Sequence, residues 1–149
     1  MKLFIKFFLS CLAFIFFTTM SFAVMPPEIY KKRMQESEIK AIAVVNKVEI
    51  TGKDKMTVDK KVYFRLEKNF GDKPVSGEFT GLCESARTEA PLAGGAVYFY
   101  PEKNERVFVT VTGDGGYITG YTSLTPELEY NINNNFDKMK FGINEIYFD

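Results

Sequence analysis

The chain has 149 residues, with 19 lysines and arginines against 19 aspartates and glutamates, two cysteines and no histidine. This length is typical of one ordinary domain, and 46% hydrophobic with 26% charged residues is a globular composition. Without histidine, the sequence excludes Ser–His and Cys–His catalytic couples, histidine zinc sites and an imidazole that titrates near neutral pH.

The first 23 residues have the layout of a secretory signal peptide. Lys2 and Lys6 give a positive start, and the apolar run of residues 7–17 follows. The small side chains of Ser21 and Ala23 predict cleavage after Ala23, and therefore a secreted or periplasmic protein.

Two alternatives to cleavage remain open. An uncleaved membrane anchor is possible because Phe7 to Met25 is a stretch of 19 mostly apolar residues. A lipid-modified Cys11 is less consistent with the sequence, because the apolar run continues for six residues beyond it. We favour cleavage because the strongly apolar part is short and the small-residue site is well placed.

Removal of the leader changes the charge and the cysteine count. It leaves 149 − 23 = 126 residues and, with Lys2 and Lys6 lost, a charge of 17 − 19 = −2. A slightly acidic chain is not attracted to phosphate backbones, so we expect no nucleic-acid partner. Cys83 then has no partner in the chain, which favours a buried thiol; an intermolecular disulfide or a reactive thiol is the alternative.

Residues 24–38 are expected to form a short N-terminal helical segment. After the two prolines, Glu28 to Glu38 reads as a helix with Ile29, Tyr30 and Met34 on one side. The basic run across its middle, residues 31–33, is interpreted as a solvated face.

Residues 39–125 alternate as strands do. Ile42, Val44, Val48 and Ile50 alternate with Ala43, Val45, Lys47 and Glu49, which indicates a long half-buried strand. After a polar turn, the run of residues 58–69 places Val62, Phe64 and Leu66 inward, and the two runs should pair as a hairpin.

The pattern is less regular after the hairpin. A third strand is predicted over residues 77–83, with a bulge at Gly81 to explain why Phe79 and Leu82 are out of phase. Residues 84–95 are predicted to be a long loop, and residues 96–100 a strand covered on both faces.

The pattern of strands and turns is clearer after residue 106. Val107, Val109 and Val111 alternate with Phe108, Thr110 and Thr112, and the glycine-rich turn at residues 113–116 leads into residues 117–119. For the C-terminal segment, residues 126–149, Thr125 is the expected N-cap and Pro126 the first position of a second helix, and residues 143–148 could add an edge strand.

These strands predict an all-β fold, β-rich with one or two short helices. Their number and the long first hairpin favour a small antiparallel OB-like barrel, and a β-sandwich is the alternative.

Several segments resemble the netrin-like OB barrels of the tissue inhibitors of metalloproteinases and their plainer bacterial exported relatives. The resemblance covers roughly residues 37–125 and rests on five segments: residues 37–45, residues 61–71, Cys83, residues 95–100, and residues 107–111 with the turn that follows. It implies an OB barrel. The inhibitors use an N-terminal cysteine to bind zinc, whereas the predicted terminus here is Val24, so no family site residue or metal carries over.

Three patterns suggest chemistry but are better explained structurally. Ser37 and Lys40 match S-x-x-K, yet the companion motifs of penicillin-recognising enzymes are missing. The oxygen-rich run of residues 131–137 lacks the glycine and glutamate of a calcium loop. Glu84 and Glu89 lie in the predicted loop, and are the carboxylates of an alternative hydrolase reading.

Tyrosines are the strongest indication of a binding surface. Tyr98 and Tyr100 should share one face of a strand, and Tyr117 and Tyr121 one face of a neighbouring strand. We therefore expect an exported, non-enzymatic barrel that needs no cofactor and binds another protein or an envelope component. The alternatives are a small carboxylate-dependent hydrolase and a structural envelope protein anchored by an uncleaved leader, the one case in which we expect membrane contact.

Overall fold

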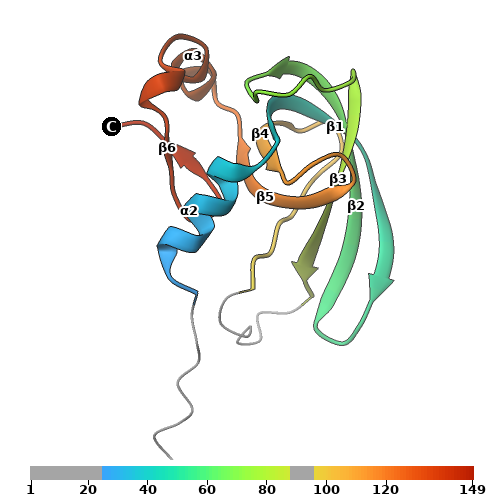
Figure 1. The fold of residues 1–149 in the computed structure, drawn as a ribbon. Coiled ribbons are helices and arrows are strands. Elements are labelled where there is room, and N and C mark those ends of the chain that lie inside the picture. Colours follow the sequence, from blue (N-terminus) through green and yellow to red (C-terminus); the bar gives the residue numbers. More distant parts are fainter. Residues whose placement is uncertain (1–24, 88–95) are drawn as a thin grey trace, which may run out of the picture.

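A computed structural model describes residues 25–87 and 96–149. Strands dominate it, and two short helices flank them (Figure 1). In chain order the elements are α2 (Pro27–Glu36), β1 (Ile39–Lys53), β2 (Thr57–Asn69), β3 (Glu78–Ala86), β4 (Arg106–Val111), β5 (Gly116–Ser123), α3 (Pro126–Asn134), the 3-10 helix η1 (Phe136–Lys138), β6 (Lys140–Phe141) and β7 (Ile146–Tyr147).

The first five strands pair in a ring, in the order β1-β2-β3-β5-β4 and back to β1. Four of these pairings are antiparallel, but β3 and β5 are parallel and share only two residue pairs, Gly81 with Gly116 and Leu82 with Tyr117. The result is a partly open, OB-like barrel. The predicted β-rich fold with two short helices is confirmed.

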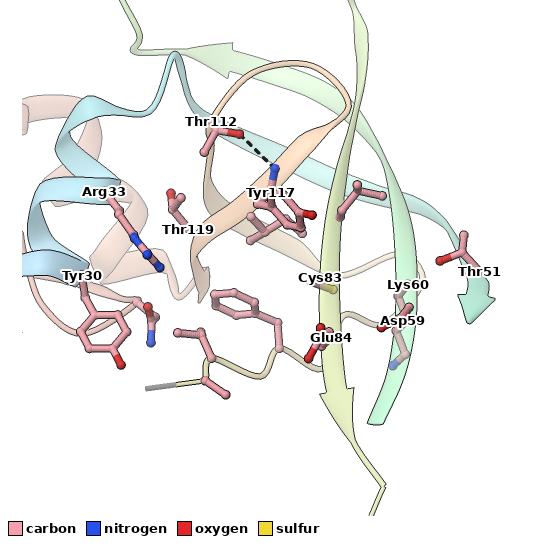
Figure 2. Close-up of a pocket in the computed structure, with 16 residues that line it drawn as sticks. Tyr30, Arg33, Thr51, Asp59, Lys60, Cys83, Glu84, Thr112, Tyr117 and Thr119 are labelled. Carbon is pink, nitrogen blue, oxygen red and sulfur yellow. Dashed lines mark hydrogen bonds between the residues drawn. The ribbon is translucent and has the colours of Figure 1, made fainter. Parts of the chain in front are cut away.

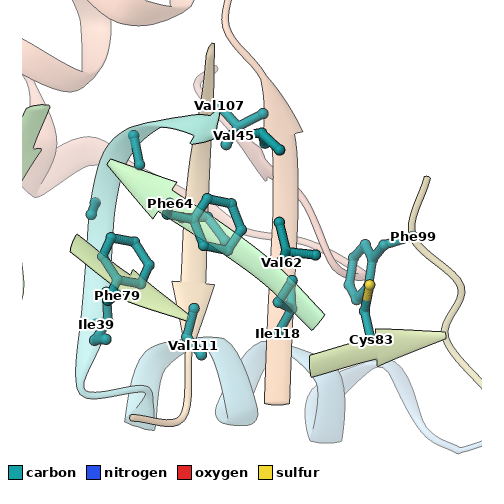
Figure 3. Close-up of a cluster of buried hydrophobic side chains, with 13 residues drawn as sticks. Ile39, Val45, Val62, Phe64, Phe79, Cys83, Phe99, Val107, Val111 and Ile118 are labelled. Carbon is teal, nitrogen blue, oxygen red and sulfur yellow. The ribbon is translucent and has the colours of Figure 1, made fainter. Parts of the chain in front are cut away.

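The barrel interior is filled by alternate residues of all five strands (Figure 3). At its centre the rings of Phe64 and Phe79 stack with centroids 5.0 Å apart. The inward positions predicted for β2 are confirmed, since Val62 and Phe64 belong to this core and Leu66 packs against it. On β4 the alternating residues Val107, Val109 and Val111 belong to the same core.

The alternation predicted for the first strand is wrong in its phase. Ala41, Ala43 and Val45 face the barrel interior, whereas Ile42 lies in a second cluster outside it. Register shifts interrupt β1 at three places, so no single alternation describes the whole strand. Ile50, near the hairpin end, is 62% exposed.

The second cluster lies outside the barrel, under the helices and the C-terminal segment. Met34 of α2, Ile42 and Phe108 of the barrel wall, Ile132 of α3 and Ile146 of β7 form its buried centre. Phe108 is therefore buried on the outer face of its strand. Of the edge strand predicted over residues 143–148 only β7 is present, and it pairs with β6 in a separate two-stranded sheet instead of extending the barrel.

Two local predictions on either side of the long loop also fail. β3 pairs with β2 without a register shift, so there is no bulge at Gly81. A side chain at this position would meet the Cγ1 atom of Ile118 at 2.7 Å, which explains the glycine. Residues 96–100 are extended but form no strand; a single isolated bridge joins Tyr98 to Glu84.

The two helices begin where the sequence indicates. α2 spans Pro27–Glu36 and buries Tyr30 and Met34, although Ile29, expected on the same side, is 38% exposed. Among the described residues, no helix has the length and apolar character needed to cross a membrane.

The N-cap predicted for α3 is present, since the Thr125 hydroxyl accepts a hydrogen bond from the Leu128 amide at 3.1 Å. Thr125→Ala should lower the free energy of unfolding by about 1 kcal/mol, because that amide loses its partner. Thr125→Ser keeps a hydroxyl and should be nearly neutral. Urea unfolding of both variants measures this, and equal losses would contradict the capping role.

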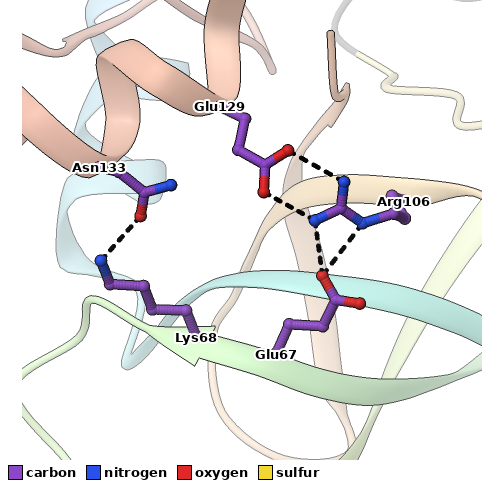
Figure 4. Close-up of polar contacts among 5 residues, drawn as sticks. All are labelled: Glu67, Lys68, Arg106, Glu129 and Asn133. Carbon is purple, nitrogen blue, oxygen red and sulfur yellow. Dashed lines mark hydrogen bonds and ion pairs between the residues drawn. The ribbon is translucent and has the colours of Figure 1, made fainter. Parts of the chain in front are cut away.

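Charged side chains attach α3 to the barrel wall (Figure 4). The Arg106 guanidinium donates to Glu67 of β2 and, through two nitrogens, to Glu129 of α3 at 2.7 and 2.9 Å. These hydrogen bonds raise the pKa of Arg106 and lower that of Glu129. Lys68 donates to the side-chain oxygen of Asn133 at 2.7 Å, which adds a second link.

Candidate binding cleft at the open seam of the barrel

The four predicted tyrosines do not form one surface. Tyr117 is 68% and Tyr100 58% exposed, whereas Tyr98 and Tyr121 are half-buried. Tyr98 and Tyr100 lie on the extended segment of residues 96–100, which is not a strand. The structure therefore does not bring Tyr98, Tyr100, Tyr117 and Tyr121 together on one shared surface.

A register shift in β5 separates Tyr117 from Tyr121. Val109 pairs with Tyr121 but Val111 pairs with Ile118, so one extra residue lies between them on β5. This bulge turns Ile118 and Tyr121 toward the interior and leaves Tyr117 outside.

Tyr121 has a structural role at one end of the barrel. Its ring packs at a tilt against Phe99, with centroids 6.1 Å apart. Its hydroxyl donates to Glu105 at 2.6 Å, and burial together with this carboxylate raises the pKa of Tyr121. Ser123 donates to the other oxygen of the same carboxylate.

Tyr117, in contrast, lies on a cleft of about 820 Å³ (Figure 2). The cleft is bounded by α2, β2, β3, the start of β5 and the extended segment of residues 96–100. Its lining residues are Tyr30, Arg33, Thr51, Asp59, Lys60, Leu82, Cys83, Glu84, Ala96, Val97, Phe99, Thr112, Tyr117, Ile118, Thr119 and Asn144.

The cleft exists because β3 and β5 separate after two residue pairs. Beyond that point β3 bonds to the extended segment, where the Phe99 amide donates to the Glu84 carbonyl oxygen at 2.9 Å. β5 bonds instead to the C-terminal segment, where the Tyr121 amide donates to the Asn144 carbonyl oxygen at 2.9 Å. Different segments thus cover the two strand edges, and a hollow remains between them.

Buried hydroxyl groups fix α2 against this seam. The Thr119 hydroxyl lies 2.7 Å from that of Ser37, just after α2, and 2.7 Å from that of Thr110 on β4. Ser37 also donates to the Arg33 carbonyl oxygen at 2.7 Å. The chain of three hydroxyls explains why α2 forms one wall of the cleft.

The cleft has an apolar interior and charged sides. Leu82, Val97, Phe99 and Ile118 supply apolar surface, and the exposed ring of Tyr117 stands at the seam. In Figure 2 the Arg33 guanidinium enters from the α2 side, and the Glu84 carboxylate lies on the opposite β3 side.

Cys83 lines the cleft but is only 8% exposed, and its sulfur packs beside Phe99 in the core (Figure 3). Burial raises the pKa of this thiol from 9.0 to about 11. The thiol therefore remains protonated near neutral pH, which disfavours a nucleophilic role.

Cys83 should react slowly with alkylating reagents in the folded protein and at least about tenfold faster in urea near pH 8. Because its pKa is raised on folding, the stability it contributes is complete below pH 9 and is lost as the pH rises toward about 11. Mass spectrometry of the peptide that carries Cys83 measures the reaction. Equal rates in buffer and urea would contradict the buried position.

The other sequence patterns do not assemble a site among the described residues. Lys40 donates to the Ser37 carbonyl oxygen at 2.8 Å, not to its hydroxyl, so the S-x-x-K spacing makes no nucleophile–base pair. The Asn133 side-chain oxygen is taken by Lys68. Glu84 is exposed on β3, and Glu89 lies outside the described residues.

Sequence reasoning missed Arg33 as a cleft residue, because a run of three basic residues is usually a solvated face. The available signal was its position one turn after Tyr30 and next to Met34, the two residues that α2 buries. A helical position beside a buried stripe lies at the edge of the packed face.

The fold and the cleft define a small, partly open β-barrel with OB-like strand order and a side cleft at its parallel seam. No protein-family model, curated protein or solved structure that was compared with the chain matches it.

Proposed function

We propose that this chain is an exported, non-enzymatic barrel that binds another protein, and that the β3–β5 cleft receives a segment of that partner. The observation that carries the proposal is the cleft itself, an apolar hollow with an exposed tyrosine at the seam. Aromatic side chains exposed beside an apolar pocket are typical of interface anchors. Export rests on the leader-like sequence of residues 1–23.

The form of the cleft favours side-chain recognition over strand addition. On the β3 edge the Glu84 carbonyl oxygen accepts from the Phe99 amide, and on the β5 edge the Tyr121 amide donates to the Asn144 carbonyl oxygen, so an added strand would find these two groups already bonded. A bound segment would gain free energy mainly by burying apolar side chains against Leu82, Val97 and Ile118.

The OB-like strand order also supports a distant relationship to the netrin-like barrels, which we retain as part of the proposal. The inhibitory mechanism of the metalloproteinase inhibitors is not part of it, because the predicted terminus offers no cysteine.

A capture experiment with matched variants tests the proposal. The exported protein is immobilised and exposed to envelope and host extracts, alongside Tyr117→Ser and Tyr130→Ser variants. Tyr130 is 65% exposed on α3 and is not among the cleft residues, so it matches Tyr117 in exposure. We expect a partner that the parent and Tyr130→Ser retain and Tyr117→Ser loses. Recovery of nothing but the protein itself would contradict the proposed function.

A further inference from the structure

We propose that the partner segment in the β3–β5 cleft is an extended peptide with a short apolar stretch between one acidic and one basic residue. This inference rests on the proposed function and adds the chemistry of the partner. It follows from the charges on two sides of the cleft and the apolar residues between them.

The acidic residue of the peptide would meet Arg33. Within the described part of the chain, the Arg33 guanidinium forms no ion pair. The Nζ atom of its neighbour Lys32, in contrast, lies 3.7 Å from Oε1 of Glu36. The guanidinium points into the cleft rather than along the helix surface (Figure 2). Arginine binds carboxylates through paired hydrogen bonds, which suits an acidic side chain at this wall.

The basic residue of the peptide would meet the opposite wall. Asp59 of β2 and Glu84 of β3 are direct cross-strand partners, so both carboxylates rise from one face of the sheet, that of Asp59 lying over Gly52 of β1. Both are exposed cleft residues, and neither forms an ion pair within residues 25–87 and 96–149.

Like charges placed directly opposite each other repel, and a cation between them relieves that repulsion. Lys61, the next residue on the same face of β2, lies over the ring of Tyr63 at 5.4 Å from its centroid, whereas Lys60 lines the cleft next to Asp59. This wall therefore carries the two carboxylates of Asp59 and Glu84 and the cation of Lys60, which leaves it net negative. A basic side chain brought by a partner would neutralise the remaining charge.

Apolar surface joins the two charged walls. Phe99, Val97 and Ile118 line the cleft, and Tyr117 is exposed at its side. A peptide that placed both charges correctly would therefore also bury apolar side chains. The combination of charges sets which peptide fits, and the apolar contacts add affinity.

An array of immobilised peptides tests this inference without knowledge of the partner. The peptides share one apolar stretch and carry acidic–basic, basic–acidic, both acidic, both basic or uncharged flanks. The full exported protein is applied as the parent and as Arg33→Glu, Glu84→Lys, the double variant and the control Lys32→Glu. All four variants change exposed side chains only, and circular dichroism checks that each protein is folded.

The parent and Lys32→Glu should retain one of the two mixed-charge orders at least about tenfold better than the other peptides. Each single cleft variant should lose that preference, and the double variant should prefer the opposite order. Binding without charge preference would overturn this inference and leave the proposed function standing. Binding of no peptide by the parent would overturn both, as would a self-associated dimer on gel filtration whose formation the Arg33→Glu variant abolishes.

Discussion

Phe64→Ala should lower the free energy of unfolding by about 3–5 kcal/mol, the largest loss we expect from any single truncation. Phe64 is completely buried at the centre of the barrel, and its ring stacks on Phe79. Its neighbours come from strands that pair around the ring, so no single strand can move inward to fill the space. Urea unfolding followed by circular dichroism measures the change as a lower midpoint.

Tyr130→Ala is the matched control for this truncation, because the same kind of ring is removed from a side chain that is 65% exposed. It should change stability by less than about 0.5 kcal/mol. A small effect of Phe64→Ala, comparable to that of the control, would show that the barrel is not packed around this ring.

Gly120→Val should cost about 1–3 kcal/mol through overpacking at the seam between α2 and β5. A Cβ atom at this position would lie 2.3 Å from the terminal methyl of Met34 and 2.8 Å from the Thr110 hydroxyl. The methionine end is flexible and can move, but the hydroxyl is buried and bonded to Thr119. The substitution therefore displaces α2 or breaks the hydroxyl chain.

Gly77→Val provides the comparison, because a Cβ atom there meets nothing within 4 Å. Thermal unfolding should separate the two variants by several degrees for a domain of this size. If both variants melt together, α2 does not pack on β5 as described.

Much of the fold follows from local sequence. The alternation of β2 and β4, the glycine-rich turn before β5 and the Thr125 cap each depend on neighbours in the chain, and each is found where predicted. The sequence also predicts the ring of strands in general terms, because a long hairpin followed by short strands favours a barrel.

The wrong phase of β1 arises because both faces of this part of the sheet are buried. Ile42 of β1 and Phe108 of the neighbouring β4 lie under the helices, while Ala43 and Val109 fill the barrel. A pattern that is apolar on both faces does not reveal which side is the interior. The same ambiguity made residues 96–100 resemble a buried strand, although Phe99 alone is buried among the aromatic residues there.

The cleft cannot be predicted from the sequence, for a different reason. It depends on where β3 and β5 part, and on a bulge that places Tyr117 and Tyr121 on different sides. Parallel pairing and register between distant segments leave no short-range signal. Alternation alone therefore groups Tyr117 with Tyr121 and places Arg33 on a solvated face.

Site-specific photo-crosslinking tests the central claim, that the partner sits in the β3–β5 cleft, most directly. A photoreactive phenylalanine replaces Tyr117 in one sample and Tyr130 in another, and both proteins are irradiated in the cells that export them. We predict a covalent adduct to a partner from position 117 and none from position 130. An adduct from position 130 alone, or none from either position, would contradict the account.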